Sequence, residues 1–147
     1  MIMEGGIQML NYKNILVPYD GSDHARKALE HAIDLAQCSK ECKMYIATIF
    51  SKAKALKHSE EKSVEELRQI AKDELEKAAA KVPETVKKET IFLEGEPRPE
   101  LLMLAEEHNC DLIVMGSRGL GPIEGILMGS VSSYLVSHSK AQVYIIK

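Results

Sequence analysis

The stretch Asn14-Ile-Leu-Val-Pro-Tyr-Asp-Gly-Ser22 predicts a buried strand, a turn and the start of a helix in immediate succession. Asn14 to Pro18 is a short apolar run, which is typical of a strand covered on both faces of a parallel sheet. The residues that follow favour a turn, and Ser22 is placed to accept hydrogen bonds from the free N–H groups of a helix over about 23–37. That helix has an apolar stripe with helical spacing, formed by Ala25, Ala28, Leu29, Ala32 and Ala36.

The same alternation of strand and helix continues to the end of the chain. Further strands are expected at 43–50, 87–93, 111–115 and 142–146, and further helices at about 64–82, 99–108 and 123–137. The polar, lysine-rich residues 51–61 predict a loop. This order predicts an α/β fold, a doubly wound five-stranded parallel sheet with helices on both faces and strand order 3-2-1-4-5. Residues 12–147 are expected to form a single domain, preceded by a flexible N-terminal tail over 1–11.

Composition narrows the possible partners and compartments. The chain has 147 residues, of which 45% are hydrophobic and 28% charged, with a net charge of -3. No basic field favours nucleic acid or an anionic membrane, and no apolar run reaches the roughly 20 residues of a membrane span. The first ten residues lack the pattern of a secretory signal, so we expect a cytoplasmic protein.

Cysteine and histidine give no sign of a metal or catalytic centre. Cys38, Cys42 and Cys110 are an odd number and argue against a disulfide framework, and no further Cys or His pair stands at zinc spacing. They are expected to be reduced thiols. The five histidines are scattered away from any nucleophile motif, and most are expected on solvated helix faces.

Two loops carry residues suited to a ligand. One follows the first strand and contains Asp20; the other follows the fourth strand and begins Gly116-Ser-Arg-Gly-Leu-Gly121. Ligands of doubly wound sheets bind at the carboxyl ends of strands where the strand order reverses, and glycine lets backbone N–H groups approach a phosphate. The alternative is structural: the glycines turn the chain into a helix, and Gly129 permits close packing. The spacing matches neither a Walker loop nor the dinucleotide fingerprint.

Three motifs in order resemble the universal stress protein family. They are Ile15 to Ser22, then Gly116-x-x-Gly119 followed after nine residues by Gly129-Ser130, and the terminal Val143-Tyr-Ile-Ile146. The resemblance extends from about Tyr12 to Lys147. It implies a Rossmann-like fold of the adenine nucleotide alpha hydrolase type that binds ATP, AMP or ADP, with Mg²⁺. One departure is Glu124, because many relatives have basic residues in this region; it weakens the local attraction for a triphosphate, so AMP or another nucleotide stays open as the ligand.

The resemblance also implies roles for individual residues. Asp20 would lie near the ribose or the metal ion, and Ile49 would flank the adenine. Competing interpretations stay open: Asp20 as an Asx turn, and Met115 and Val131 as core residues. The complete set of nucleotide-binding residues implied in this way is Pro18, Asp20, Ile49, Met115, Gly116, Arg118, Gly119, Gly129, Ser130, Val131 and Ser132.

The leading hypothesis for function is a nucleotide-binding sensor or switch in the stress response, which is not primarily an enzyme. The alternatives are a slow ATP hydrolase or nucleotide-transfer enzyme, and an interaction module that binds AMP or no nucleotide. Phosphoryl transfer needs strong charge neutralisation, and Arg118 with a metal on Asp20 is a sparse set of groups for it. The final strand, 142–146, is apolar on both faces, so we expect it at a sheet edge, where it pairs with its own copy in a homodimer.

Overall fold

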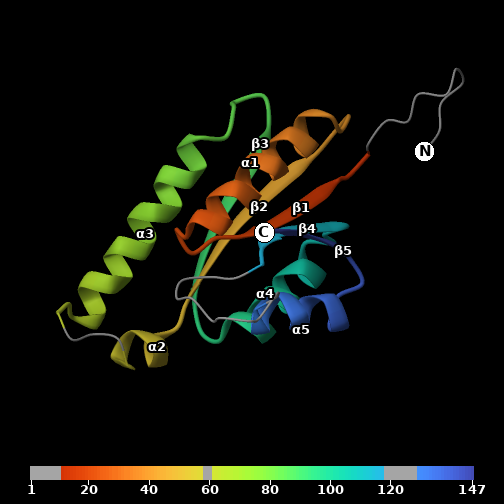
Figure 1. Ribbon diagram of the computed structural model, residues 1–147. Coiled ribbons are helices and arrows are strands. Elements are labelled where there is room, and N and C mark those ends of the chain that lie inside the picture. The colour runs from red at the N-terminus through yellow and green to blue at the C-terminus, as the bar shows by residue number, and fades with distance from the viewer. Residues whose placement is uncertain (1–10, 58–60, 118–128) are drawn as a thin grey trace, which may run out of the picture.

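The computed structural model describes residues 11–57, 61–117 and 129–147. Its sheet has five parallel strands in the order β3-β2-β1-β4-β5 (Figure 1), which confirms the predicted fold and strand order. The strands are β1 (Asn14–Pro18), β2 (Lys43–Phe50), β3 (Lys87–Glu94), β4 (Leu112–Gly116) and β5 (Gln142–Ile146). The helices are α1 (Asp23–Gln37), α2 (Lys52–Lys57), α3 (Val64–Ala80), α4 (Pro97–Glu107) and α5 (Ser130–His138).

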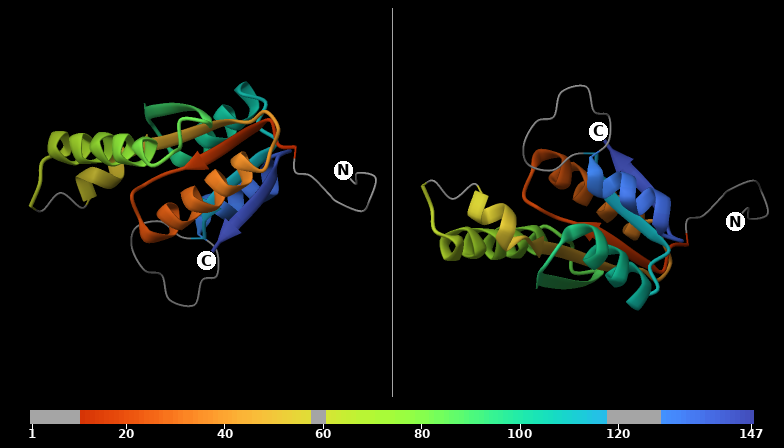
Figure 2. Two further views of the ribbon diagram at one scale, coloured as in Figure 1. Left: turned by 90° about the horizontal axis from the view of Figure 1, so that it is seen from above. Right: turned by 90° about the horizontal axis from the view of Figure 1, so that it is seen from below.

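The helices cover both faces of the sheet. Helices α1 and α3 pack on one face, where Leu29 and Leu75 share an apolar cluster with strand residues such as Ile46. Helices α4 and α5 pack on the other face, through Leu104 and Leu135. Figure 2 views the molecule from two opposite sides, with α1 toward the viewer from above and α4 and α5 toward the viewer from below. The continuous apolar run in β1 is explained by this arrangement, because a strand between two helical layers has no solvated face.

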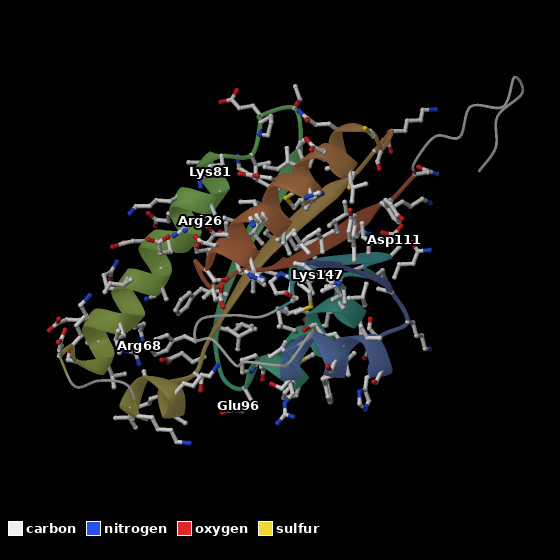
Figure 3. All side chains as sticks on the ribbon, in the orientation of Figure 1. Arg26, Arg68, Lys81, Glu96, Asp111 and Lys147 are labelled. Carbon is white, nitrogen blue, oxygen red and sulfur yellow. The ribbon has the colours of Figure 1, made fainter. Side chains whose placement is uncertain are left out.

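Local signals in the sequence start two of the helices. Ser22 Oγ accepts a hydrogen bond from the N–H of Ala25 at 3.2 Å, and Ser63 Oγ accepts one from Glu66 at 3.1 Å. Each serine therefore satisfies an N–H group that the helix itself leaves unpaired. The start of β1 is fixed by Asp111 beside β4 (Figure 3), whose carboxylate accepts from the N–H groups of Lys13 and Asn14 at 2.9 and 3.0 Å.

Most boundaries agree with the sequence prediction to within two residues, but two features differ more. Residues 52–57 are not a loop but the short helix α2, whose Ala55 is buried; a helix of six residues is too short for a visible apolar period. The helix expected from Ile123 begins at Ser130, because Gly129 has the extended backbone of an N-cap (φ -75°, ψ 170°). Residues 123–128 lie outside the described part of the chain.

Candidate functional site

The two loops singled out from the sequence leave the sheet side by side. β1 lies between β2 and β4, with Ile15 opposite Leu112 and Leu16 opposite Ile113. The chain moves from β1 toward β3 on one side and returns to β4 on the other, so the strand order reverses between β1 and β4. The carboxyl ends of these two strands therefore mark the position at which doubly wound folds bind ligands.

The loop after β1 is held in a fixed conformation by its own residues. Asp20 Oδ1 accepts a hydrogen bond from the N–H of Ser22 at 3.0 Å, which forms an Asx turn. Gly21 has a φ of +81°, a left-handed conformation that L side chains rarely adopt. The Asx-turn interpretation of Asp20 is thus correct, and it is compatible with a ligand role, because the side chain stays exposed.

Hydrogen bonds hold the start of this loop to the neighbouring strand β2. The N–H of Tyr19 donates to the carbonyl of Ala47 at 2.8 Å, and the hydroxyl of Thr48 donates to the carbonyl of Tyr19 at 2.8 Å. Burial raises the pKa of Tyr19, although the nearby Arg26 opposes this shift. Thr48 is itself buried, so the loop begins on a rigid support.

The loop after β4 starts from Ser117, which connects three elements. Its N–H donates to the carbonyl of Ile146 in β5 at 2.8 Å, and its carbonyl accepts from the N–H of Gly129 and from the hydroxyl of Ser132, the latter at 3.1 Å. Its hydroxyl lies 2.9 Å from His24 Nδ1 in α1. Ser117 and Gly129, the described residues on either side of this loop, are therefore bonded to each other.

Gly116, just before this point, is required by the approach of α1. A Cβ at Gly116 would lie 2.5 Å from His24 Cβ and 2.9 Å from the carbonyl carbon of His24. Real Cβ atoms essentially never come this close to another heavy atom. The first turn of α1 thus packs directly on the end of β4, and it brings the two loops together.

Three apolar residues of the predicted nucleotide site belong to one cluster on the α4/α5 face of the sheet. Met115 is buried in the apolar cluster beneath α4 and α5, and Ile49 and Val131 pack against the same cluster with part of their surface exposed. Pro18, at the end of β1, is also half-buried. Met115 is therefore a core residue, whereas Ile49 and Val131 combine a packing role with partial exposure to solvent.

The remaining predicted residues separate into three groups. Gly129 and Ser130 form the amino-terminal end of α5, with Ser130 exposed. Ser132 is 1% exposed, and its hydroxyl bonds inward to Ser117, so it supports the loop from beneath. Arg118 and Gly119, together with Glu124, lie outside the described residues.

Sequence reasoning missed three residues at this site. Thr48 supports the first loop, Ser117 joins the second loop to the fold, and His24 connects the two. His24 is an exception to the expectation that most histidines lie on solvated helix faces, because it is half-buried against Ser117. Ser117 could have been noted from its place inside the glycine motif, but no local pattern marks His24 or Thr48, because their partners lie far away in sequence.

Asp20 has the chemistry of a magnesium ligand bound together with a nucleotide. Within the described ranges, no three His, Cys, Asp or Glu residues gather as a metal cluster. Mg²⁺ in nucleotide sites is commonly held by one or two carboxylates plus phosphate oxygens and water. The exposed carboxylate of Asp20 at the end of β1 fits this pattern, and the other ligands would come from the nucleotide and solvent.

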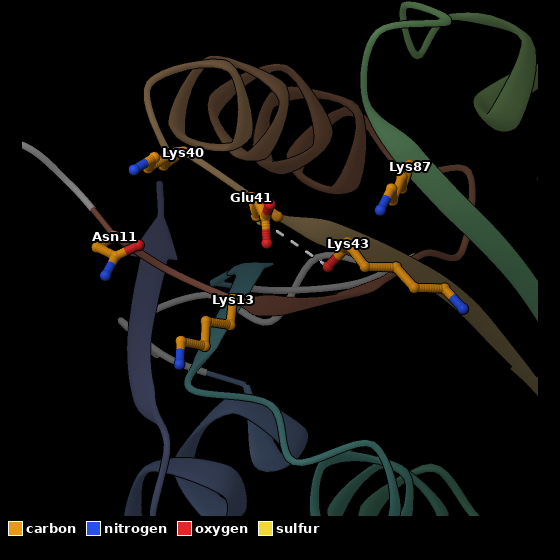
Figure 4. A pocket seen from close by; sticks show the side chains of 7 residues that line it. Asn11, Lys13, Lys40, Glu41, Lys43 and Lys87 are labelled. Atoms are coloured by element: carbon orange, nitrogen blue, oxygen red, sulfur yellow. Dashed lines mark hydrogen bonds between the residues drawn. The ribbon is translucent and has the colours of Figure 1, made fainter.

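A hollow at the opposite end of the sheet has different chemistry (Figure 4). It is lined by Asn11, Lys13, Lys40, Glu41, Cys42, Lys43 and Lys87, at the amino ends of β1, β2 and β3. Lys43 is already paired with Glu89 at 3.0 Å. The hollow lies away from the strand ends where the two loops meet, so the site described above does not include it.

Known proteins share both the sequence pattern and the fold of this chain. Residues 11–147 match the universal stress protein family, so the chain belongs to that family. It is 33% identical over 141 residues to universal stress protein MJ0531 of Methanocaldococcus jannaschii, covering 92% of this chain and 82% of that protein.

Solved structures agree with this assignment. The structure of MJ0577, a universal stress protein from the same organism, has a TM-score of 0.78 and 28% identity, covering 92% of this chain and 96% of that one. A universal stress protein solved in complex with cAMP has a TM-score of 0.63 and 31% identity, covering 92% and 97% of the two chains.

In the described ranges, no helix is both long and apolar enough to cross a bilayer.

Proposed function

We propose that this universal stress protein binds ATP, or a closely related adenine nucleotide, between the loops that follow β1 and β4, and acts as a nucleotide-dependent sensor or switch in the stress response. The observation that carries the proposal is the junction of these two loops at the point where the strand order reverses. The cAMP complex of a relative supports an adenine nucleotide as the ligand.

The described residues suggest which part of the nucleotide each of them would contact. Ile49 offers half-buried apolar surface on the α4/α5 face for the adenine, Pro18 would line the adenosine side, and Val131 would lie nearer the ribose and phosphates, while the buried Met115 supports this surface from within the core. The N–H groups at the start of α5, next to Gly129 and Ser130, favour phosphate because of their direction and the helix dipole. Asp20 would hold Mg²⁺ against the phosphates, and Arg118 and Gly119 would complete the phosphate side.

A direct test identifies the ligand without assuming it. The purified protein is denatured, and the released small molecules are identified by mass; titration calorimetry with ATP, ADP, AMP and cAMP then ranks their affinities. Release of an adenine nucleotide, or saturable binding of one, is expected. Failure of all four to bind would contradict the proposal and favour an interaction module without nucleotide.

The first prediction places the phosphates at Gly129. Its backbone is extended, so valine can adopt it without strain, but a branched side chain at the start of α5 would obstruct an approaching phosphate. Gly129→Val should therefore abolish detectable ATP binding in calorimetry while the helical circular dichroism is retained. Ser137→Val is the matched control, because it puts the same side chain on an exposed position in the last turn of α5. Unchanged affinity in Gly129→Val would remove this loop from the site.

A further inference from the structure

The hydroxyl of Ser117 is buried and depends on a partner from another element. Ser117 is 2% exposed, and its N–H and carbonyl are occupied by β5 and by the start of α5. Its Oγ lies 2.9 Å from His24 Nδ1, in the first turn of α1. Among the described residues, every buried side-chain nitrogen or oxygen has a hydrogen-bond partner. Removing the imidazole would therefore leave a buried hydroxyl without its hydrogen-bond partner, which is unfavourable.

His24 stands directly between the two loops of the site. It follows Asp20, Gly21 and Ser22 by a few residues, and its backbone and Cβ pack on Gly116. Through Ser117 it reaches the pair of residues that closes the second loop, because the carbonyl of Ser117 accepts from Gly129. The His24–Ser117 hydrogen bond thus connects the first turn of α1, which follows the loop after β1, with the residue at which the loop after β4 begins.

We propose that His24 is a positioning residue for the nucleotide site: its hydrogen bond to Ser117 fixes the start of α1 relative to Ser117 and the start of α5, so that Asp20 and the start of α5 can hold one ligand together. The inference rests on the proposed function for its ligand, but the bond itself is a property of the unliganded protein. His24 acts through Ser117 and is assigned no contact with the nucleotide.

Two substitutions at His24 separate the hydrogen bond from packing. Leucine keeps the bulk against Gly116 but has no polar atom. Asparagine can place an amide nitrogen or oxygen where Nδ1 of the imidazole lies, and so can restore the bond. Loss of the bond should weaken ATP affinity by about 5- to 30-fold in His24→Leu, the equivalent of a buried hydrogen bond. Affinity in His24→Asn should return to within about threefold of the unmodified protein, which a purely steric role would not produce.

A double-mutant cycle with Ser117→Ala tests whether the two residues act together. If the bond is the relevant interaction, His24→Leu combined with Ser117→Ala should weaken ATP binding no more than the stronger single substitution. Additive losses, or equal affinities for the leucine and asparagine variants, would overturn the proposal. Urea unfolding of each variant shows that the protein measured is folded.

Hydrogen exchange on the unliganded protein distinguishes failure of this inference from failure of the proposed function. His24→Leu should accelerate exchange at the amide of Gly129, which bonds to Ser117, and leave the central amides of β1 unchanged. If the unmodified protein binds no adenine nucleotide, the proposed function fails, and the exchange rates still report on the bond. Unchanged exchange at Gly129 in His24→Leu would overturn the inference whether or not nucleotide binds.

Discussion

At the scale of single residues, the backbone beside the site favours glycine at two positions. Gly116 and Gly21 are both glycines for physical reasons, but the reasons differ. At Gly116 the conflict is steric, since an added Cβ meets the backbone of α1. At Gly21 the conflict is conformational, since φ is +81° and the nearest atom to an added Cβ is 3.5 Å away. The two positions should therefore tolerate different substitutions.

The second prediction follows from this contrast. Gly116→Ala should lower the free energy of unfolding by about 1–3 kcal/mol, the usual cost of forcing an extra carbon into a packed site. Gly21→Asn should cost less than about 1 kcal/mol, because asparagine accepts the left-handed region more readily than other side chains. Urea denaturation of both variants measures the difference. A Gly116→Ala protein as stable as the unmodified one would show that α1 can move away from β4.

The third prediction concerns Asp20 and magnesium. Asp20→Asn keeps an oxygen that can accept from the N–H of Ser22, so the Asx turn is preserved while the charge is lost. We expect ATP affinity to fall about tenfold in Mg²⁺, or roughly 1.4 kcal/mol, and to change little in EDTA. Asp34→Asn, exposed on α1, is the control for net charge. Equal losses in both buffers would leave Asp20 with a structural role only.

At the scale of elements, the three cysteines lie at or near the ends of helices and strands, and how deeply each is buried there sets its reactivity. Cys38 is exposed at the end of α1, whereas Cys42 directly precedes β2, Cys110 lies two residues before β4, and both are partly buried. Burial raises the pKa of Cys42 to about 11, with Asp111 adding to the shift, and raises that of Cys110 to about 12. All three are free thiols, as expected.

The fourth prediction is a difference in thiol reactivity. At pH 8 a thiol of pKa about 11 is ionised in about one molecule in a thousand, and one of pKa about 12 in about one in ten thousand, and only the thiolate is nucleophilic. Iodoacetamide should therefore modify Cys38 first in the folded protein, followed slowly by Cys42 and Cys110. Peptide mass mapping over time gives the order, and urea should abolish it. Modification of Cys110 as fast as Cys38 in the native protein would contradict it.

Most elements could be predicted from sequence because their signals are local. The apolar run of β1, the serine before α1 and the capping box before α3 each act within a few residues. The short helix α2 has too few residues to show a period, and the start of α5 depends on Gly129 being an N-cap rather than a helical residue. The contacts of His24, Thr48 and Ser117 could not be predicted, since they join residues that only the sheet order brings together.

At the scale of the whole molecule, the two edges of the sheet differ. β3 forms one edge, and its exposed first half, Lys87-Lys-Glu-Thr90, carries the charges that usually prevent strands from pairing. β5 forms the other edge and has the sequence Gln-Val-Tyr-Ile-Ile, with Tyr144 42% exposed. The predicted position of the last strand at an edge is confirmed. Of the two edges, β5 is the one suited to pairing with a second copy.

The fifth prediction is a homodimer through β5. The N–H of Gln142 and the carbonyl of Ile146 bond toward β4, so alternation along the strand turns the backbone groups of Val143 and Ile145 outward. Ile145→Pro should remove an outward donor without breaking the ladder to β4, and should shift a dimer toward monomer in sedimentation. Tyr144→Pro is the contrasting variant, because it breaks the internal ladder and should destabilise the fold itself. A monomer of about 16 kDa for the unmodified protein well above micromolar concentration would refute the dimer.

The bond between Ser117 and Gly129 also has a consequence for how this protein can diverge and be engineered. Because Ser117 and Gly129 are bonded to each other, both ends of the connection from β4 to α5 are held by the described part of the fold. When the two ends of a connection are fixed, doubling its length costs only about 0.6 kcal/mol in closure entropy. We therefore expect that segments of other lengths and charges can replace residues 118–128 while the sheet and its helices keep their structure, and that such exchanges change the ligand preference.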